Sequence, residues 1–233
     1  MVIDVLRAST TMITALAHGA ERVVPMADVA EARRRAAGIG AQALLGGERG
    51  GVRIAGFDLG NSPAEYAAER VAGRTIVITS TNGTAALAAC AAAREVLVGA
   101  IVNRTAVAAM ARRRAVPDGG DTVHLVCAGT DGAVTAEDVL AAGAILDAAA
   151  LHPEAAGDEL DPPALAARAA FRDLAAGHPD DLPAALEAAF AAAPGGANLI
   201  TLGMAADLAF AARIDALDVV PRLDHGTGVL RAA

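Results

Sequence analysis

The segment Ile76–Thr84, with the sequence IVITSTNGT, decides the fold class of this chain. Ile76–Ile78 is a short run of β-branched apolar residues, which is typical of a buried strand. The hydroxyl and amide side chains of Thr79–Asn82 follow, and Gly83 and Thr84 then open an Ala/Leu-rich segment that we expect to be helical. This order places hydroxyls and unpaired backbone N–H groups at a helix N-terminus, where an anion such as phosphate is favoured. The alternative is an ordinary helix cap, because Ser, Thr and Asn are preferred at caps in any protein.

The same order of strand, polar loop and helix occurs at two other places. Asp4 interrupts the apolar stretch Met1–Leu6, and Ala8–Thr11 then opens a helix. The stretch Thr122–Val126 leads into the small-residue loop Cys127–Gly132. Alternating strands and helices predict an α/β fold, layered α/β/α, with a largely parallel or mixed sheet built from repeated strand–loop–helix units. Ligands of such folds bind at the carboxyl ends of strands, so we expect the polar loops to form the site.

The length of 233 residues fits one domain with a full core. We treat residues 1–233 as a single α/β domain, with a division into two α/β lobes near residues 115–121 as the alternative. The Ala- and Pro-rich segment Leu151–Gly195 predicts short surface helices. We expect one helix over Thr201–Arg213, a last strand over Leu217–Val220 and an exposed turn after it.

Composition limits the classes of partner. A net charge of −8 argues against nucleic acid, because phosphate backbones need a basic surface. No apolar run approaches the roughly 18 residues of a membrane span, and no export signal is recognisable. Two cysteines in such a chain predict free thiols in a reducing cytoplasm. The Ala-rich composition is also compatible with a homodimer.

The basic residues and histidines exclude several kinds of catalytic site. All 19 basic residues are Arg, so the chain has no Walker-type lysine, no Schiff-base lysine and no lysine general base. The five histidines show no paired metal-ligand spacing, which argues against a zinc site. An anionic substrate must therefore be met by Arg, by a metal ion or by a helix terminus.

The remaining candidates for chemistry are acids and arginines near the polar loops. Asp4, Glu48 and Asp58 offer the oxygen ligands that suit Mg²⁺, and Arg7 and Arg49 suit bidentate contacts to an oxyanion. The alternative for each acid is a helix cap or a surface ion pair. For Asp4 that alternative is weak, because a carboxylate inside an apolar strand needs a partner.

Three further groups have a mainly structural interpretation. Ser62 and Glu65 stand where the cap and third residue of a helix would be, on either side of Pro63. Thr135 and Asp138 have the same spacing, which favours a capping role for Asp138. Cys127 either presents a reactive thiolate or is a small buried residue, and the buried role is favoured.

Six ordered motifs together resemble the 2-phosphosulfolactate phosphatase family. They are DVLRASTT (Asp4–Thr11), GGERGG (Gly46–Gly51), GFDLGNSP (Gly56–Pro63), TSTNGT (Thr79–Thr84), VCAG (Val126–Gly129) and the pair Glu137-Asp138. The resemblance covers most of the chain. It implies a Mg²⁺-dependent phosphatase of α/β fold that converts 2-phospho-3-sulfolactate to sulfolactate and phosphate in coenzyme M biosynthesis.

The residues and the resemblance together define the expected site. The expected catalytic residues are Asp4, Arg7, Glu48, Arg49 and Asp58. The expected Mg²⁺ ligands come from Asp4, Glu48, Asp58, Glu137 and Asp138. The expected substrate-binding residues are Ser9, Thr10, Asn61, Ser80, Thr81, Asn82, Gly83, Thr84, Asn103, Cys127 and Gly129.

Two questions stay open at this point. Attack by metal-activated water is our default mechanism, and an aspartyl-phosphate on Asp4 is its rival. The alternative function is a non-catalytic protein that binds a phosphorylated or sulfonated small molecule.

Overall fold

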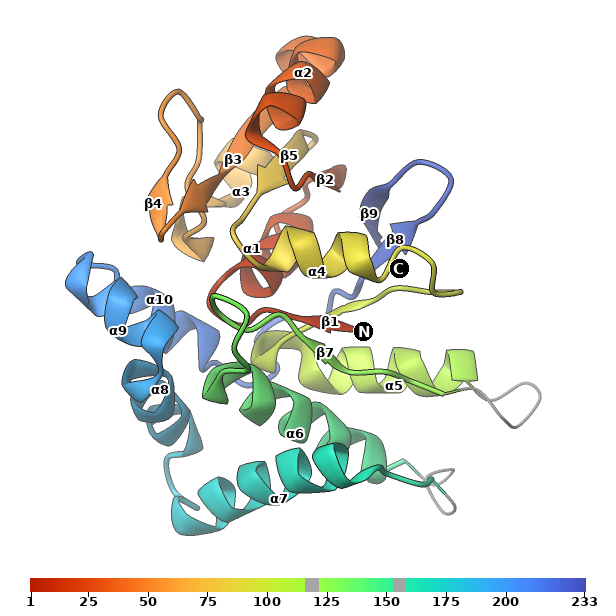
Figure 1. Cartoon of the computed structure of the whole chain (residues 1–233), viewed down its shortest axis with the longest axis vertical. Coiled ribbons are helices and arrows are strands. Elements are labelled where there is room, and N and C mark those ends of the chain that lie inside the picture. The colour runs from red at the N-terminus through yellow and green to blue at the C-terminus, as the bar shows by residue number, and fades with distance from the viewer. Residues whose placement is uncertain (116–121, 153–157) are drawn as a thin grey trace.

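The computed structural model describes residues 1–115, 122–152 and 158–233. It confirms a layered α/β fold with parallel and mixed strands, and it divides these strands between two sheets instead of the one expected (Figure 1). The alternative lobe boundary near residues 115–121 falls almost wholly on residues 116–121, which lie outside the described ranges. None of the helices in these ranges has the length and apolar character needed to cross a membrane.

The larger sheet has six strands in the order β4-β3-β5-β2-β9-β8. Its strands are β2 (Arg22–Pro25), β3 (Ala43–Arg49), β4 (Val52–Arg53), β5 (Thr75–Thr79), β8 (Pro221–Asp224) and β9 (Val229–Ala232). β5 is parallel to both of its neighbours, with Ile76 opposite Val23 of β2 and Leu44 of β3. All five residues of β5 are buried, which confirms the strand predicted from Ile76–Ile78.

The smaller sheet is parallel and has three short strands. Their order is β6 (Val98–Gly99), β1 (Val2–Ile3), β7 (Val126–Cys127). The predictions of strands over Met1–Leu6 and Thr122–Val126 were therefore too long at their ends. β1 stops at Asp4 because the Asp4 N–H donates to Ser9 Oγ at 2.9 Å. The two sheets meet where Leu97, beside β6, pairs with Arg222 of β8.

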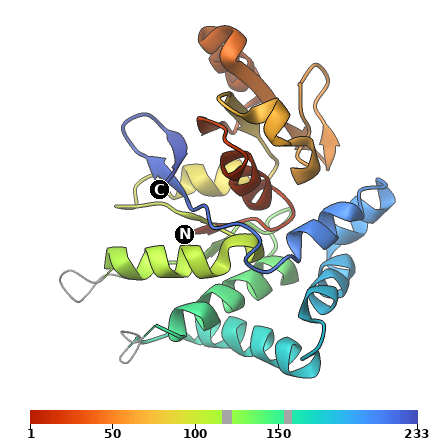
Figure 2. The same ribbon diagram turned by 180° about the vertical axis from the view of Figure 1, so that it is seen from behind.

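Helix α1 (Ala8–Ala17) lies between the two sheets (Figure 2). Val2 of β1 packs in the same core cluster as Met12 and Ile13 of α1, together with Ile76 of β5. Ile3 points to the opposite face of the small sheet and packs with the outer helices. This alternation follows the two-residue period of a strand. Nine of the ten residues of α1 are buried, because sheet strands cover it on both sides.

The outer layers are helical. α2 (Val29–Ile39) covers the far face of the six-stranded sheet, where its Ala32 packs with Val24 and Val77. α5 (Arg104–Ala115) and α6 (Ala136–Ala150) cover the far face of the small sheet, as Figure 1 shows. The other helices are α3 (Ala68–Val71), α4 (Gly83–Ala89), α7 (Pro162–Gly177), α8 (Leu182–Ala192), α9 (Pro194–Thr201) and α10 (Ala206–Ala211).

Three predictions for the second half of the chain were wrong. Within 151–195 the described part forms the long helices α7 and α8, which pack through the buried Phe171 and Phe190. The single helix expected over Thr201–Arg213 is divided, because Gly203 has φ +74° and ends α9. The last strands are β8 and β9 rather than Leu217–Val220, and the exposed turn between them was predicted correctly.

Candidate active site

A cavity of about 410 Å³ opens where the loops after four parallel strands converge. The loops follow β1, β3, β5 and β7, and the start of α9 closes the remaining side. This position confirms the expectation that the polar loops meet at the carboxyl ends of strands. The cavity is lined by Asp4, Leu6, Arg7, Glu48, Gly50, Gly51, Asn61, Ser80, Thr81, Asn82, Thr130, Asp131, Pro194, Gly195, Asn198 and Leu199.

Asp4 is a buried acid in this cavity. One carboxylate oxygen accepts the Ala8 N–H at 3.1 Å, and the other lies so close to Gly83 that a Cβ there would collide with it. Burial, reinforced by the charges of Asp138, Glu48 and Glu137, raises the pKa of Asp4 to about 8. At neutral pH the site therefore favours either a proton on Asp4 or a cation beside it.

Glu48 joins two walls of the cavity. One oxygen accepts the backbone N–H and the hydroxyl of Thr81, at 2.8 and 3.0 Å. The other oxygen accepts the Gly51 N–H at 2.7 Å. Glu48 therefore holds the loop after β5 and the β3–β4 hairpin in fixed positions, and the Thr81 hydroxyl is already engaged.

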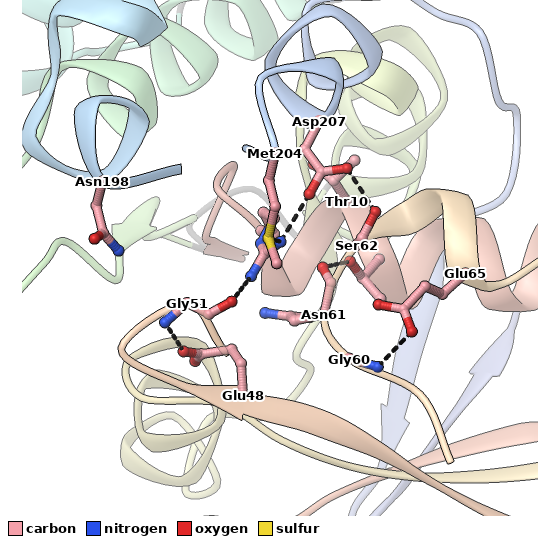
Figure 3. A network of polar contacts seen from close by, with 12 residues as sticks. Thr10, Glu48, Gly51, Gly60, Asn61, Ser62, Glu65, Asn198, Met204 and Asp207 are labelled. Carbon is pink, nitrogen blue, oxygen red and sulfur yellow. Dashed lines mark hydrogen bonds and ion pairs between the residues drawn. The ribbon is translucent and has the colours of Figure 1, made fainter. Parts of the chain in front are cut away.

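Arg7 is buried and is held by three protein partners. One terminal nitrogen donates to Asp207 Oδ2 at 2.7 Å and to Met204 Sδ at 2.9 Å. The other donates to the Gly51 carbonyl at 2.7 Å. Asp207 also accepts the Ser62 hydroxyl at 2.6 Å, and Figure 3 shows this network from Asp207 to Glu48. These contacts use three of the five guanidinium N–H groups, so a bidentate contact to a ligand needs the other two.

The start of α4 combines a cap with a free amide. Ser80 Oγ accepts the Thr84 N–H at 3.1 Å, and the Thr84 hydroxyl donates back to the Ser80 carbonyl at 2.9 Å. The capping alternative therefore applies to Ser80 and Thr84. Asn82 occupies the N-cap position without a side-chain capping bond and lines the cavity. Its amide is available to a ligand there.

Asp138 does not cap α6 as predicted. Its two oxygens accept the Val5 N–H and the Gly129 N–H, both at 2.9 Å, and thereby tie the loops after β1 and β7 together. Burial is the main reason that its pKa rises to about 6. Thr135 stands at the cap position but makes no capping bond.

Glu137 and Cys127 lie behind the cavity wall. Glu137 is buried, and its Oε2 has no hydrogen-bond partner in the described chain. A Cβ on Gly195 would lie 3.4 Å from Glu137 Oε1, so Gly195 separates this acid from the cavity. Burial and the charges of Asp138 and Glu137 raise the pKa of Cys127 to about 12, which disfavours a reactive thiolate.

Several predicted site residues are placed outside the cavity. Asp58 is exposed and accepts the Leu45 N–H at 2.8 Å, so the structure does not bring it to the other acids. Arg49 is exposed and donates to Glu48 O, Ala27 O and Thr79 Oγ1.

The remaining members of the predicted set have backbone partners. Ser9 accepts the Asp4 N–H, and Thr10 donates to the Val5 carbonyl at 2.8 Å. Asn103 donates to the Val98 and Val219 carbonyls and accepts the Ala100 N–H. These side chains hold the loops and strands that form the site.

The sequence interpretation missed several polar contributors, among them one residue of α9 and one of α10. Asn198 of α9 lines the cavity and donates to the Gly50 carbonyl at 3.2 Å. Asp207 of α10 fixes Arg7. Gly203 was the available signal, because a glycine after a helical segment marks its end and would have divided the helix between these two residues. Ser62 was interpreted as a helix cap, but its hydroxyl donates to Asp207 instead. Glu65 accepts the Gly60 N–H and does not complete a capping box.

The acids of the cavity could help to bind a hard cation, but they do not form a complete metal site by themselves. In residues 1–115, 122–152 and 158–233, no three His, Cys, Asp or Glu side chains gather closely enough to hold a metal by themselves. Mg²⁺ needs only one or two carboxylates when substrate oxygens and water complete its shell. Burial and the neighbouring acids raise the pKa of Asp4, which indicates negative charge that the cavity does not compensate. The donor set therefore suits Mg²⁺ bound together with an oxyanion.

Comparisons with known proteins agree in one family. The family profile described as 2-phosphosulpholactate phosphatase matches residues 1–226. A probable 2-phosphosulfolactate phosphatase of Carboxydothermus hydrogenoformans is 39% identical over 238 residues, which covers 100% of this chain and 90% of that protein. One from Synechococcus sp. (strain RCC307) is 42% identical, over 98% of this chain and 90% of its own. One from Caldicellulosiruptor saccharolyticus is 43% identical, over 63% of this chain and 60% of its own.

Proposed function

Because this chain belongs to the 2-phosphosulpholactate phosphatase family, we propose that it hydrolyses the phosphate ester of 2-phospho-3-sulfolactate, with Mg²⁺ as its cofactor. The single observation that carries the proposal is the convergence of Asp4, Arg7, Glu48, Asn61 and the start of α4 in one cavity. These groups supply an acid, a guanidinium and helix-start donors, which are what a small phosphorylated acid requires.

The residues have distinct roles in this proposal. The Asn82 amide and those backbone N–H groups at the start of α4 that Ser80 and Glu48 do not already engage bind the phosphate oxygens beside Asp4. Glu48 keeps that loop at a fixed distance from the hairpin that carries Gly51. Arg7, oriented by Asp207, meets a second anionic group of the substrate.

The reaction is the addition of water to phosphorus with cleavage of the ester P–O bond. The products are phosphate and sulfolactate, and the leaving oxygen takes up a proton. Mg²⁺ bound near Asp4 would neutralise phosphate charge and activate the attacking water. Asp4 either accepts a proton from the attacking water, or attacks phosphorus itself to give an aspartyl-phosphate that a water molecule then hydrolyses to phosphate; both roles make it essential.

The first test is phosphate release from a panel of phosphorylated three-carbon acids, with Mg²⁺ and with chelator. We expect metal-dependent release that favours 2-phosphosulfolactate. Phosphate release from another acid would support the phosphatase reaction but show that 2-phosphosulfolactate is not the preferred substrate. Calorimetric binding of 2-phosphosulfolactate without any release would support the non-catalytic alternative instead.

Location and assembly belong to the proposal as well. Cys90 and Cys127 are both free thiols, which agrees with the proposed location in a reducing cytoplasm. The proposed role in coenzyme M biosynthesis rests on the family alone. A homodimer stays a prediction from composition. Sedimentation velocity at micromolar concentration would support it if the protein sediments as a dimer and contradict it if the protein sediments as a monomer.

A further inference from the structure

The turn of the β3–β4 hairpin forms part of the cavity wall. Residues 49–53, which we call the hairpin tip, contain the two-residue turn Gly50-Gly51. Both glycines line the cavity, and so does Asn198 of α9. The two walls touch here, because Asn198 Nδ2 donates to the Gly50 carbonyl at 3.2 Å, and Figure 1 shows the hairpin end opposite α9. The hairpin tip and α9 therefore close one side of the cavity together.

The hairpin tip has little apolar packing of its own. Its Val52 side chain is 51% exposed, and an added Cβ at Gly50 would have nothing within 4 Å. Strand β4 consists of two residues, and both are exposed. Segments with few buried apolar contacts open locally at a low cost in free energy. Polar contacts must therefore hold the hairpin tip in its closed position.

The base of the hairpin is packed firmly, in contrast to its tip. Gly47 is buried, and its N–H donates to the carbonyls of Leu59 and Gly60 at 3.1 and 3.0 Å. A Cβ on Gly47 would lie 2.1 Å from the Thr79 carbonyl oxygen, so the strands are in close contact at this point. Any movement of the hairpin must therefore begin after Gly47 and involve the hairpin tip alone.

The polar contacts that hold the hairpin tip come from buried groups of the cavity. The Gly51 N–H donates to Glu48 Oε2 at 2.7 Å, and the Gly51 carbonyl accepts a terminal N–H of Arg7 at 2.7 Å. Glu48 and Arg7 both line the cavity, where a ligand would meet them. A ligand that contacts either side chain differs in its interactions between the open and closed positions, so its binding is coupled to the position of the tip.

The contact between the hairpin tip and α9 is close but reversible. A Cβ on Gly51 would lie 2.6 Å from Leu202 Cδ1 and 3.0 Å from Asn198 Nδ2, so glycine allows the tip to reach α9. Asn198 is exposed, and water can replace the Gly50 carbonyl as its partner. The bond between Asn198 and Gly50 can therefore break and form again while the rest of the fold stays in place.

We propose that the hairpin tip is a gate, which opens to admit and release the ligand of the cavity, and that Asn198 holds it closed. This inference rests on the proposed function only in taking the cavity as the ligand site. The alternative is that the hairpin tip is a fixed wall.

The first test measures ligand exchange in Asn198→Ala. NMR line shapes of sulfolactate protons and of the phosphorus of inorganic phosphate give the dissociation rate, and titration gives Kd. Loss of the bond favours the open tip both with and without ligand, so we expect association and dissociation to become about 2- to 10-fold faster at a nearly constant Kd. A changed Kd with an unchanged association rate would show that Asn198 only binds the ligand, which would overturn the gate.

Thr201→Ala is the matched control for this variant. Thr201 is exposed on the same helix, and its hydroxyl donates to the Ala197 carbonyl at 3.0 Å, away from the hairpin tip. We expect both exchange rates to match those of the wild type. Equal acceleration in the two variants would assign the effect to a loosened α9 and contradict the role of Asn198.

A disulfide between the two walls tests the movement directly. A side chain at position 51 would approach Asn198 closely enough for the Cβ separation of about 3.5–4.5 Å that a disulfide needs, so Gly51→Cys combined with Asn198→Cys should cross-link. We expect oxidation to slow ligand exchange and turnover of 2-phosphosulfolactate by about 10-fold or more, and reductant to restore both. The reduced form carries the same substitutions, and the wild type receives the same oxidant. Equal rates in the cross-linked and reduced forms would establish a fixed wall.

Hydrogen exchange of the wild type without ligand tests the gate independently of any variant. The Gly51 and Gly47 amides are both hydrogen-bonded, and we expect Gly51 to exchange about 10-fold faster or more, because only the tip opens. Equal exchange at the two glycines would overturn the proposal. If no phosphoester is hydrolysed but the cross-link slows phosphate exchange, the proposed function fails and the gate stands. Normal turnover that the cross-link leaves unchanged would have the opposite meaning.

Discussion

At the scale of one residue, Asp4 shows that a group needed in the site can lower the stability of the folded protein. Its carboxyl group is buried beside Gly83, and the nearby acids Asp138, Glu48 and Glu137 all raise its pKa. A buried carboxylate among like charges is destabilising unless a cation or a proton compensates it. The protein keeps Asp4 at this position at a cost to the metal-free state, which is what a catalytic acid requires.

We predict that Asp4→Asn stabilises the metal-free protein and abolishes turnover. Removing the charge should raise the free energy of unfolding by about 1–2 kcal/mol, which shifts Tm by about 2–8 °C for a chain of this size. We expect kcat to fall by about 100-fold or more. Differential scanning calorimetry and a phosphate-release assay measure the two effects, and full turnover in the variant would disprove both proposed roles of Asp4.

The pH dependence of stability follows from the same group and from Asp138. In the unfolded chain both carboxyls titrate near 4, and in the folded chain both pKa values are higher. The folded chain therefore binds protons more tightly, so this contribution to stability is fully present below about pH 4 and is lost as the pH rises toward 8. We expect the Tm of the metal-free protein to fall between pH 6 and 8, and to fall less in Asp4→Asn. Equal slopes in the two proteins would contradict the assignment.

Asp58 provides the control for these predictions. It belongs to the same GFDLGNSP motif as Asn61, yet it is exposed, and its carboxylate accepts the Leu45 N–H. We expect Asp58→Asn to keep the kcat/KM of the wild type. A large loss of kcat with normal folding would return Asp58 to the set of catalytic residues.

At the scale of elements, the start of α4 depends on contact between two segments that are far apart in the sequence. Gly83 is the first residue of α4, and a Cβ there would collide with Asp4 Oδ2 and Ala8 Cβ. Helix propensity alone favours Ala over Gly by about 1 kcal/mol. Packing opposes that preference, because the neighbours are a buried side chain and another helix.

We therefore predict that Gly83→Ala destabilises the protein by about 1–3 kcal/mol and lowers kcat. Gly38 is the matched control, since it lies inside α2 with nothing within 4 Å of an added Cβ. Gly38→Ala should stabilise by up to about 1 kcal/mol. Urea unfolding of both variants measures the difference, and a stabilised Gly83→Ala would show that Asp4 is not packed against this helix.

The sequence predicted the elements that are governed by local rules. The strand at Ile76–Ile78, the polar loops and their meeting at strand ends follow from residue type and order. The way the two sheets meet depends on pairing between distant segments, such as Leu97 with Arg222, which no local pattern contains. The role of Asp207 could not be predicted for the same reason, because its partner Arg7 is 200 residues away in the chain. Asp58 and Asp4 are both aspartates, so the sequence could not distinguish their roles. The structure does, because Asp4 is buried and Asp58 is exposed.

At the scale of the whole molecule, the cavity joins distant parts of the chain. The β3–β4 hairpin contributes Gly50 and Gly51, and α9 contributes Asn198, which donates to Gly50. Ligand contacts at this end would therefore restrain the hairpin and α9 together. We predict that sulfolactate slows amide hydrogen exchange in both segments and leaves α2 unchanged. Protection of only one of the two segments would show that the ligand does not bridge them.

Helix α1 has a further consequence for how this protein tolerates change. A helix with sheets on two sides offers no outward face on which substitutions can accumulate, and its hydroxyls at Thr10, Thr11 and Thr14 already satisfy specific carbonyls. The exposed faces of the outer helices can accept substitutions, whereas α1 must keep nearly the same size and polarity at each turn. A saturation mutagenesis map should therefore show α1 as an almost unbroken block of rejected charged substitutions, beside an α2 that accepts them at every exposed position.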